Sequence, residues 1–296
     1  MNLDSMQDIL TAVREKGQPM WEIVLEMDME SRGVTREQSM EKMTEVWRAM
    51  VEASDSYVGD RRSRSGLVGG QGEKMRSYAA RGRTIGGDFT SQVIAEALSM
   101  GESNACMRRI VAAPTAGACG VMPAVLVTLY RQGKYTEHQM LQAMYVASGI
   151  GAVIAYRAGI SGAAGGCQAE IGSASAMAAG ALVSLRSGSV EQICDAVAMA
   201  LKNLLGLVCD PVAGLVEVPC VKRNVIGAMN AIAAADMAMA GVESQIPADE
   251  VIDAMGEVGR RLPVELRETA LGGLAATPTG KAIKEKMLKD RKNNVL

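Results

Sequence analysis

The chain has few of the side chains that most often build β-sheets or transfer protons. Aromatic residues make up only 3% of its 296 residues, and His138 is the single histidine. Strands favour aromatic and β-branched residues, whereas Ala, Leu and Met favour helices. Because 48% of the residues are hydrophobic and 21 are Met, the composition predicts an all-α fold. The lone histidine also leaves the chain poor in the commonest general base.

Two further features are missing, an excess of positive charge and a long apolar run. The net charge of −2 provides no basic field for the phosphates of a nucleic acid, so we expect no such partner. The basic cluster 61–65 is predicted to be a solvated loop, with an anion contact as the alternative. The run 141–156 is too short and too diluted by Gln, Ser and Gly to span a membrane, and it predicts a buried helix. The first ten residues carry acids and do not resemble a signal peptide, so we expect a cytoplasmic protein without membrane association.

The chain is organised as a helical extension followed by a longer body. A capping-box pattern at Thr35 and Gln38 predicts a helix start, and the Gly- and Ser-rich segment 60–72 indicates a break. We therefore predict an N-terminal extension (1–58) and a main domain (59–296). The body should alternate Ala- and Met-rich helices with Gly/Pro-rich loops at helix ends, which we expect to form the active site. The predicted helices are 88–100, 122–132, 137–157, 169–186, 190–207, 221–241 and 249–261, and the loops are 112–120, 159–168, 209–220 and 276–280.

The six cysteines include no CxxC pair, and a cytoplasmic protein of this size does not need disulfides. Cys167 and Cys220 each precede a predicted helix, where the helix dipole should favour a thiolate and lower the thiol pKa. Cys209 follows a predicted helix. Three thiolates can hold an iron–sulfur cluster with one open iron, but the spacing alone is a weak signal and favours inert packing of the cysteines. Three cysteines are predicted to be core residues, although the last lies in a loop and could approach the site: Cys106, Cys194 and Cys119.

Four segments of the chain resemble signatures of the iron–sulfur-dependent L-serine dehydratases, and they follow one another in the order expected for that family. They are GCQAEIGSASAMAA (166–179), GLVCDPVAGLVEVPCVKRN (206–224), APTAGACGVMPAV (113–125) and GGLAATPTG (272–280). The resemblance covers roughly residues 65–285. It implies that Cys167, Cys209 and Cys220 hold a four-iron four-sulfur cluster, and that residues 59–296 form the catalytic domain. The implied reaction is the α,β-elimination of water from L-serine, giving pyruvate and ammonia, with the open iron as Lewis acid.

Other residues in these segments are candidates for binding substrate or supporting the cluster. Thr115, Gly117 and Thr279 lie in Pro-Thr loops next to predicted helices. Backbone N–H groups and a Thr hydroxyl can hold a carboxylate there, and helix capping is the alternative. Arg223 and Asn224 follow Cys220 in its motif, where they could orient the cluster ligands through hydrogen bonds or satisfy the adjacent backbone.

The general base is not assigned to this chain. In the family that it resembles, a second region carries a Ser-Ser-Ser-His-Thr segment and further histidines, on the same chain or on a separate one. This sequence has neither, and its first 58 residues contain no His. His138 lies in a capping-box pattern and is predicted to be a surface residue. The chain thus resembles the stand-alone alpha subunit, and we expect a beta subunit with the base and an oligomeric assembly.

Alternatives to L-serine dehydration remain open from the sequence. A cluster-dependent elimination from another β-substituted amino acid, such as L-cysteine or L-threonine, uses the same ligands. A pyridoxal-phosphate dehydratase needs a Schiff-base lysine, and no Lys stands in a matching context, so we expect no pyridoxal phosphate. The alternative of another class is a helical scaffold whose buried cysteines are inert.

Overall fold

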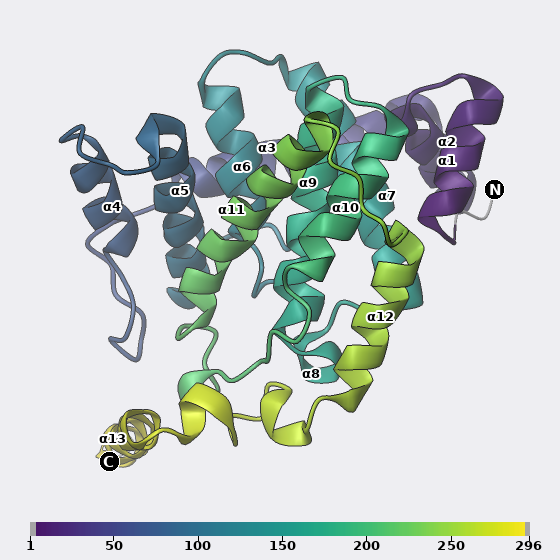
Figure 1. The fold of residues 1–296 in the computed structure, drawn as a ribbon. Coiled ribbons are helices and arrows are strands. Elements are labelled where there is room, and N and C mark those ends of the chain that lie inside the picture. Colours follow the sequence, from purple (N-terminus) through teal and green to yellow (C-terminus); the bar gives the residue numbers. More distant parts are fainter. Residues whose placement is uncertain (1–3, 294–296) are drawn as a thin grey trace.

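The computed structural model describes residues 4–293, and the regular structure in that range is helical (Figure 1). These described residues form no β-sheet and contain only an isolated bridge between Cys209 and Arg267. The predicted all-α fold is confirmed. The α-helices are α1 (Met6–Lys16), α2 (Met20–Arg32), α3 (Arg36–Asp55), α4 (Gln71–Ala79), α5 (Gly87–Ala105), α6 (Val121–Arg131), α7 (Glu137–Arg157), α8 (Gly162–Gly165), α9 (Ser173–Leu185), α10 (Val190–Lys202), α11 (Cys220–Met239), α12 (Ala248–Arg261) and α13 (Pro278–Asn293). The shorter turns are η1 (Gln168–Gly172), η2 (Val212–Gly214), η3 (Val264–Leu266) and η4 (Gly273–Ala276).

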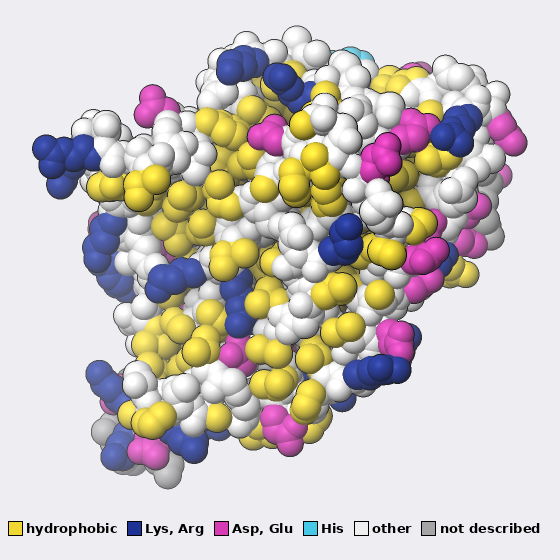
Figure 2. All heavy atoms as spheres, in the orientation of Figure 1, with side chains coloured by type: hydrophobic (Ala, Val, Ile, Leu, Met, Phe, Trp, Pro, Cys, Tyr) yellow, Lys and Arg dark blue, Asp and Glu magenta, His cyan; other side chains and the backbone are white. Residues whose placement is uncertain are grey.

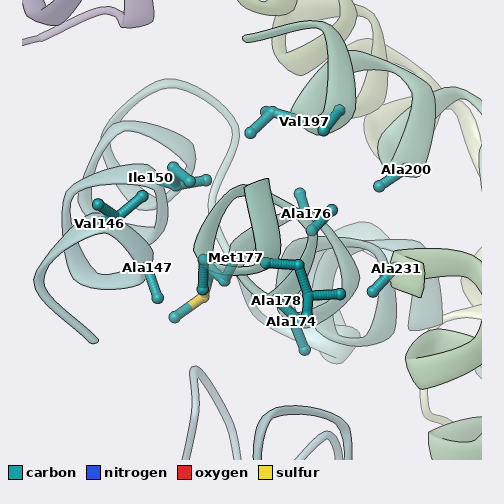
Figure 3. Packing of buried hydrophobic residues seen from close by; sticks show 14 of the residues in the cluster. Val146, Ala147, Ile150, Ala174, Ala176, Met177, Ala178, Val197, Ala200 and Ala231 are labelled. Atoms are coloured by element: carbon teal, nitrogen blue, oxygen red, sulfur yellow. The ribbon is translucent and has the colours of Figure 1, made fainter. Parts of the chain in front are cut away.

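The central element is α9, in which every residue from 173 to 183 is buried. A helix that is apolar on all sides belongs in the interior, and its many Ala and Gly residues let neighbouring helices approach closely. It packs against α6, α7, α10 and α11. Figure 3 shows side chains of α9 between those of α7, α10 and α11. The labelled residues of α9 are Ala174, Ala176, Met177 and Ala178, and those of its neighbours are Val146, Ala147, Ile150, Val197, Ala200 and Ala231.

The N-terminal helices share the apolar core of the body. Helix α2 packs against α7, α3 against α6 and α7, and α1 against α10 and α12. Trp47 of α3 is 1% exposed and belongs to the same core cluster as α9. The capping box of Thr35 and Gln38 is present at the start of α3, as predicted. The domain boundary between residues 58 and 59 stays a prediction.

The run that was too short to span a membrane, 141–156, lies within α7, most of whose residues are buried. Among the described residues, no helix combines the length and apolar character needed to cross a bilayer.

The helix ends differ from the prediction where the site is formed. The helix predicted to begin at residue 169 starts instead with the π-helical turn η1, which continues into α9. Such turns are rare and are frequent at functional sites. Helix α10 ends at Lys202, five residues earlier than predicted. Pro278 begins α13, so the loop predicted at 276–280 is partly helical.

Segments distant in sequence meet at one end of the helical bundle. Figure 1 shows α8, the beginning of α11, and the segment that contains η3 and η4 at this end. Helix α12 packs against α8 and η1, and η2 packs against η4 and α13. The cysteine loops lie among these elements.

Candidate active site

Cys167 is fixed by the tight turn that precedes it. Gly166 has φ +78°, and a Cβ on it would lie 3.0 Å from the carbonyl oxygen of Leu207, so only glycine fits. The amide of Gln168, the residue after Cys167, donates to the same Leu207 carbonyl at 2.9 Å. Cys167 is 3% exposed. The chain around Cys167 is therefore joined directly to the chain that leads to Cys209.

Cys209 is covered by the segment between α12 and η4. Its amide donates to the carbonyl of Leu266 at 2.8 Å, and its own carbonyl accepts from the amide of Glu268 at 2.8 Å. Cys209 is 3% exposed. Cys220 is the first residue of α11 and is partly buried. The sequence correctly predicted that Cys167 and Cys220 lie at helix starts.

The thiols of these three cysteines lie within electrostatic reach of one another. The Cys209 thiol interacts with those of Cys167 and Cys220, and Cys220 interacts with Cys167. The remaining cysteines have other neighbours. The thiol of Cys119 donates to the carbonyl of Met100 at 3.7 Å, and Cys194 is influenced by Asp249.

Burial, rather than the helix dipole, controls the protonation of the three thiols. It raises the pKa of Cys167 to about 11 and that of Cys220 to about 12, and it also raises the pKa of Cys209. The expectation of lowered pKa values was wrong, because loss of water destabilises a thiolate more than a helix start stabilises it here. Without metal the thiols are neutral at pH 7, and a coordinated metal deprotonates its thiol ligands.

Three cysteine thiols are a donor set that would suit an iron–sulfur cluster. Within the described part of the chain, no three His, Cys, Asp or Glu side chains are placed to hold one ion. A zinc ion draws its ligands to within about 2.0–2.3 Å of one centre. In a four-iron cluster each cysteine binds a different iron, so its three thiols stand farther apart. The thiols of Cys167, Cys209 and Cys220 interact electrostatically, and the first two residues are buried whereas the third is partly buried.

Arg223 joins the segments of Cys167 and Cys209. Its guanidinium donates to the carbonyl of Val208 at 2.7 Å and to Asp210 Oδ1 at 2.8 Å, and its positive charge acts on the Cys167 thiol by lowering the pKa of that thiol. Asp210 also accepts from the amide of Leu274 at 2.8 Å. The Arg223–Asp210 ion pair is largely buried, with 12% and 4% of the side chains exposed. It ties the cysteine loops to the segment that covers them.

Asn224 attaches the loop 112–120 to the start of α11. Its Oδ1 accepts from the amide of Gly120 at 2.8 Å, and its Nδ2 donates to the carbonyls of Gly117 at 2.9 Å and Cys220 at 3.0 Å. Asn224 is 1% exposed. Its side chain satisfies backbone groups and, in doing so, places Gly117 next to the Cys220 segment.

Glu170, on the π-helical turn η1, was missed by the sequence reasoning. It interacts electrostatically with the thiols of Cys167, Cys209 and Cys220. The hydroxyl of Thr115 donates to its Oε1 at 2.7 Å. Burial raises the pKa of this carboxyl group. The available signal was modest: Glu170 is the one acidic residue of the segment 166–179.

The remaining predicted residues lie apart from this group. Thr279 is exposed in the first turn of α13, and no described hydrogen bond joins it to the cysteine segments. His138 is exposed near the start of α7, beside Gln142 and Trp21, as predicted for a surface histidine.

Comparisons with known proteins show the family of the chain. The model of a family described as "Serine dehydratase alpha chain" matches residues 15–275. The chain is 44% identical over 283 residues to the "Probable L-serine dehydratase, alpha chain" of Bacillus subtilis (strain 168), covering 96% of this chain and 94% of that protein. It is 43% identical over 289 residues to the "L-serine dehydratase, alpha chain" of Peptoniphilus asaccharolyticus, covering 97% and 99%. It is 38% identical over 278 residues to the "L-serine dehydratase" of Streptomyces coelicolor (strain ATCC BAA-471 / A3(2) / M145), covering 90% of this chain but 59% of that protein. The chain belongs to the serine dehydratase alpha chain family.

Proposed function

We propose that this chain is the alpha subunit of an L-serine dehydratase, a lyase that eliminates water from L-serine and yields pyruvate and ammonia. The observation that carries the proposal is the meeting of three buried, mutually interacting thiols within the segments that resemble the family signatures. We assign Cys167, Cys209 and Cys220 as ligands of a four-iron four-sulfur cluster, and we expect no pyridoxal phosphate. When bound, such a cluster supplies an iron without a protein ligand, which acts as a Lewis acid on the substrate hydroxyl.

The chain's own residues position the ligands and exclude water. Arg223 and Asp210 hold the cysteine loops together. The segment 264–274 covers Cys209 through backbone hydrogen bonds. We retain Thr115, Gly117 and Thr279 as candidates for the substrate carboxylate. Because the Thr115 hydroxyl already donates to Glu170, a carboxylate in that loop would rely on backbone N–H groups.

We propose that the base for the α-proton lies on a beta subunit with a Ser-Ser-Ser-His-Thr segment. A base must come within hydrogen-bond reach of the proton that it removes, and the chain's single histidine is exposed on α7. The longer Streptomyces relative, of which this chain matches 59%, has room for such a region on the same chain.

Exposed apolar side chains border the thiol site and suit a partner surface. Figure 2 shows hydrophobic side chains gathered on this face of the molecule, including its lower part. The exposed apolar residues on the elements around the site are Ile226, Val264, Leu271 and Leu274. We expect the assembled enzyme to bury them. All six cysteines are free, which accords with a reducing compartment, and we propose the cytoplasm.

The test is anaerobic co-expression with candidate beta chains, followed by iron and sulfide analysis and a pyruvate assay on L-serine. The proposal expects cluster-bound iron and L-serine turnover by the complex, with the alpha chain alone nearly inactive. Activity should decay in air and return with ferrous iron and a thiol reductant. Faster turnover of L-cysteine or L-threonine would favour the alternative substrates. An iron-free chain without activity in any complex would favour the inert scaffold.

A further inference from the structure

Glu170 is a carboxylate that the proposed chemistry has not used, and it lies within electrostatic reach of the three thiols. We propose that Glu170, together with Glu268, binds the α-ammonium group of the substrate. This inference rests on the proposed function and adds to it the group that selects an amino acid. Glu170 lies on η1, three residues after Cys167. Its negative charge interacts electrostatically with each of the three thiols.

The position of the Glu170 carboxylate is defined by one hydroxyl and two glycines. Oε1 accepts the Thr115 hydroxyl at 2.7 Å. A Cβ on Gly117 would lie 2.9 Å from Oε1, and a Cβ on Gly162 would lie 2.7 Å from Oε2. Any larger residue at either position would displace the carboxylate. Two loops that are 45 residues apart in the sequence thus both have a glycine beside the Glu170 carboxylate. The position of this carboxylate is therefore defined by the fold.

Glu268 approaches the same glycine from the covering segment. Glu268 is exposed, and its Oε2 would lie 3.4 Å from the same Cβ position on Gly162 that Oε2 of Glu170 approaches at 2.7 Å. Its backbone has φ +62°, an unusual conformation for a non-glycine residue, and its amide donates to the carbonyl of Cys209 at 2.8 Å. Such conformations persist where surrounding contacts enforce them and are common at functional sites.

In the part of the chain that the structure describes, neither Glu170 nor Glu268 belongs to an ion pair. The groups that act on Glu170 are the Thr115 hydroxyl and the like-charged Glu268, and no ion pair described for the chain includes Glu170. A half-buried carboxylate next to another one is costly unless a cation neutralises it. The ammonium group of an amino acid placed between them supplies that charge. Arg223, whose charge acts on the Cys167 thiol, is already paired with Asp210.

This assignment predicts how the site discriminates between substrates. L-glycerate has the carboxylate and β-hydroxyl of L-serine but carries a hydroxyl in place of the ammonium. A site built around a charged group rejects an analogue that lacks it, because its own buried polar groups then stay unpaired. The pocket should therefore accept 2-amino-3-hydroxy acids and disfavour 2,3-dihydroxy acids.

The experiment uses the reconstituted alpha–beta complex and compares Glu170→Gln with Glu265→Gln, an exposed glutamate of the covering segment. We measure KM for L-serine, the inhibition constant of L-glycerate, and the iron content with the visible absorption of the cluster. Glu170→Gln should raise KM for L-serine by about tenfold or more, as expected for the loss of one charge-assisted contact. The glycerate constant should stay unchanged or fall, and the iron content should equal that of the wild type. Glu265→Gln should match the wild type in all readouts.

Glu268→Gln provides an independent test and should raise KM for L-serine in the same direction. An unchanged KM in Glu170→Gln, or equal weakening of serine and glycerate, would overturn the inference. Loss of iron in Glu170→Gln, combined with an unchanged KM in Glu268→Gln, would overturn it as well. These results presuppose a wild-type complex that dehydrates serine, so failure of the proposed function would already be visible in the wild type.

Discussion

At the scale of single residues, cysteines whose pKa values are raised by burial differ in the groups that surround them. Burial raises the pKa of both Cys209 and Cys194, but Cys209 adjoins two other thiols, whereas Cys194 adjoins Asp249 and Asp195. We expect Cys209→Ser to lose most of the roughly four irons that a reconstituted chain binds. Cys194→Ser should retain them. Iron and sulfide assays after anaerobic reconstitution measure the difference, and equal iron in both variants would remove Cys209 from the ligand set.

Arg223 offers a second test at the residue scale, because its planar guanidinium serves two acceptors at once. It donates to the Val208 carbonyl at 2.7 Å and to Asp210 at 2.8 Å. Lysine cannot reproduce this fork, so we expect Arg223→Lys to lower the free energy of unfolding by about 1–3 kcal/mol. The cluster should also lose iron faster in air. The exposed neighbour change Lys222→Arg is the control, and denaturant unfolding with timed iron release gives both readouts. Identical behaviour of the two variants would contradict a supporting role for Arg223.

At the scale of elements, close packing of alanine-rich helices sets the stability of the bundle. Ala234 of α11 is fully buried, whereas the adjacent Ala233 is exposed. Ala234→Leu should overpack the contact of α11 with its neighbours and lower the free energy of unfolding by about 1–3 kcal/mol. Ala233→Leu should change it by less than about 0.5 kcal/mol. Urea unfolding of both variants tests this, and a larger loss in Ala233→Leu would mean that α11 faces the core with its other side.

At the scale of the whole molecule, the apolar residues around the thiol site should contact the beta subunit. Leu271 is 61% exposed on the covering segment, and Ile85 is fully exposed between α4 and α5. We expect Leu271→Lys to weaken association by about tenfold or more, because a charge in an apolar interface remains unpaired. Ile85→Lys should associate normally. Co-purification with a tagged beta chain and titration of serine dehydratase activity measure the effect. Weakening by Ile85→Lys alone would place the interface elsewhere.

The sequence by itself determined the helical class and most helix positions, because these depend on composition and on local signals. Few aromatic residues and many Ala and Met residues indicated an all-α fold, which the structure confirms. The capping boxes at Thr35 and Thr136 are present. The four signature-like segments indicated the family, and with it the three cysteines as candidate ligands.

Only the tertiary structure decided which groups surround those cysteines, since the decisive contacts join residues far apart in the chain. Thr115 meets Glu170 across 55 positions, and Cys209 pairs with the segment 266–268. Neither contact leaves a local pattern in the sequence. The raised thiol pKa values likewise follow from burial by several elements together, which outweighs the local helix dipole that the sequence shows. Local propensity determines where helices form, whereas long-range packing determines which side chains surround the cysteines at the helix ends.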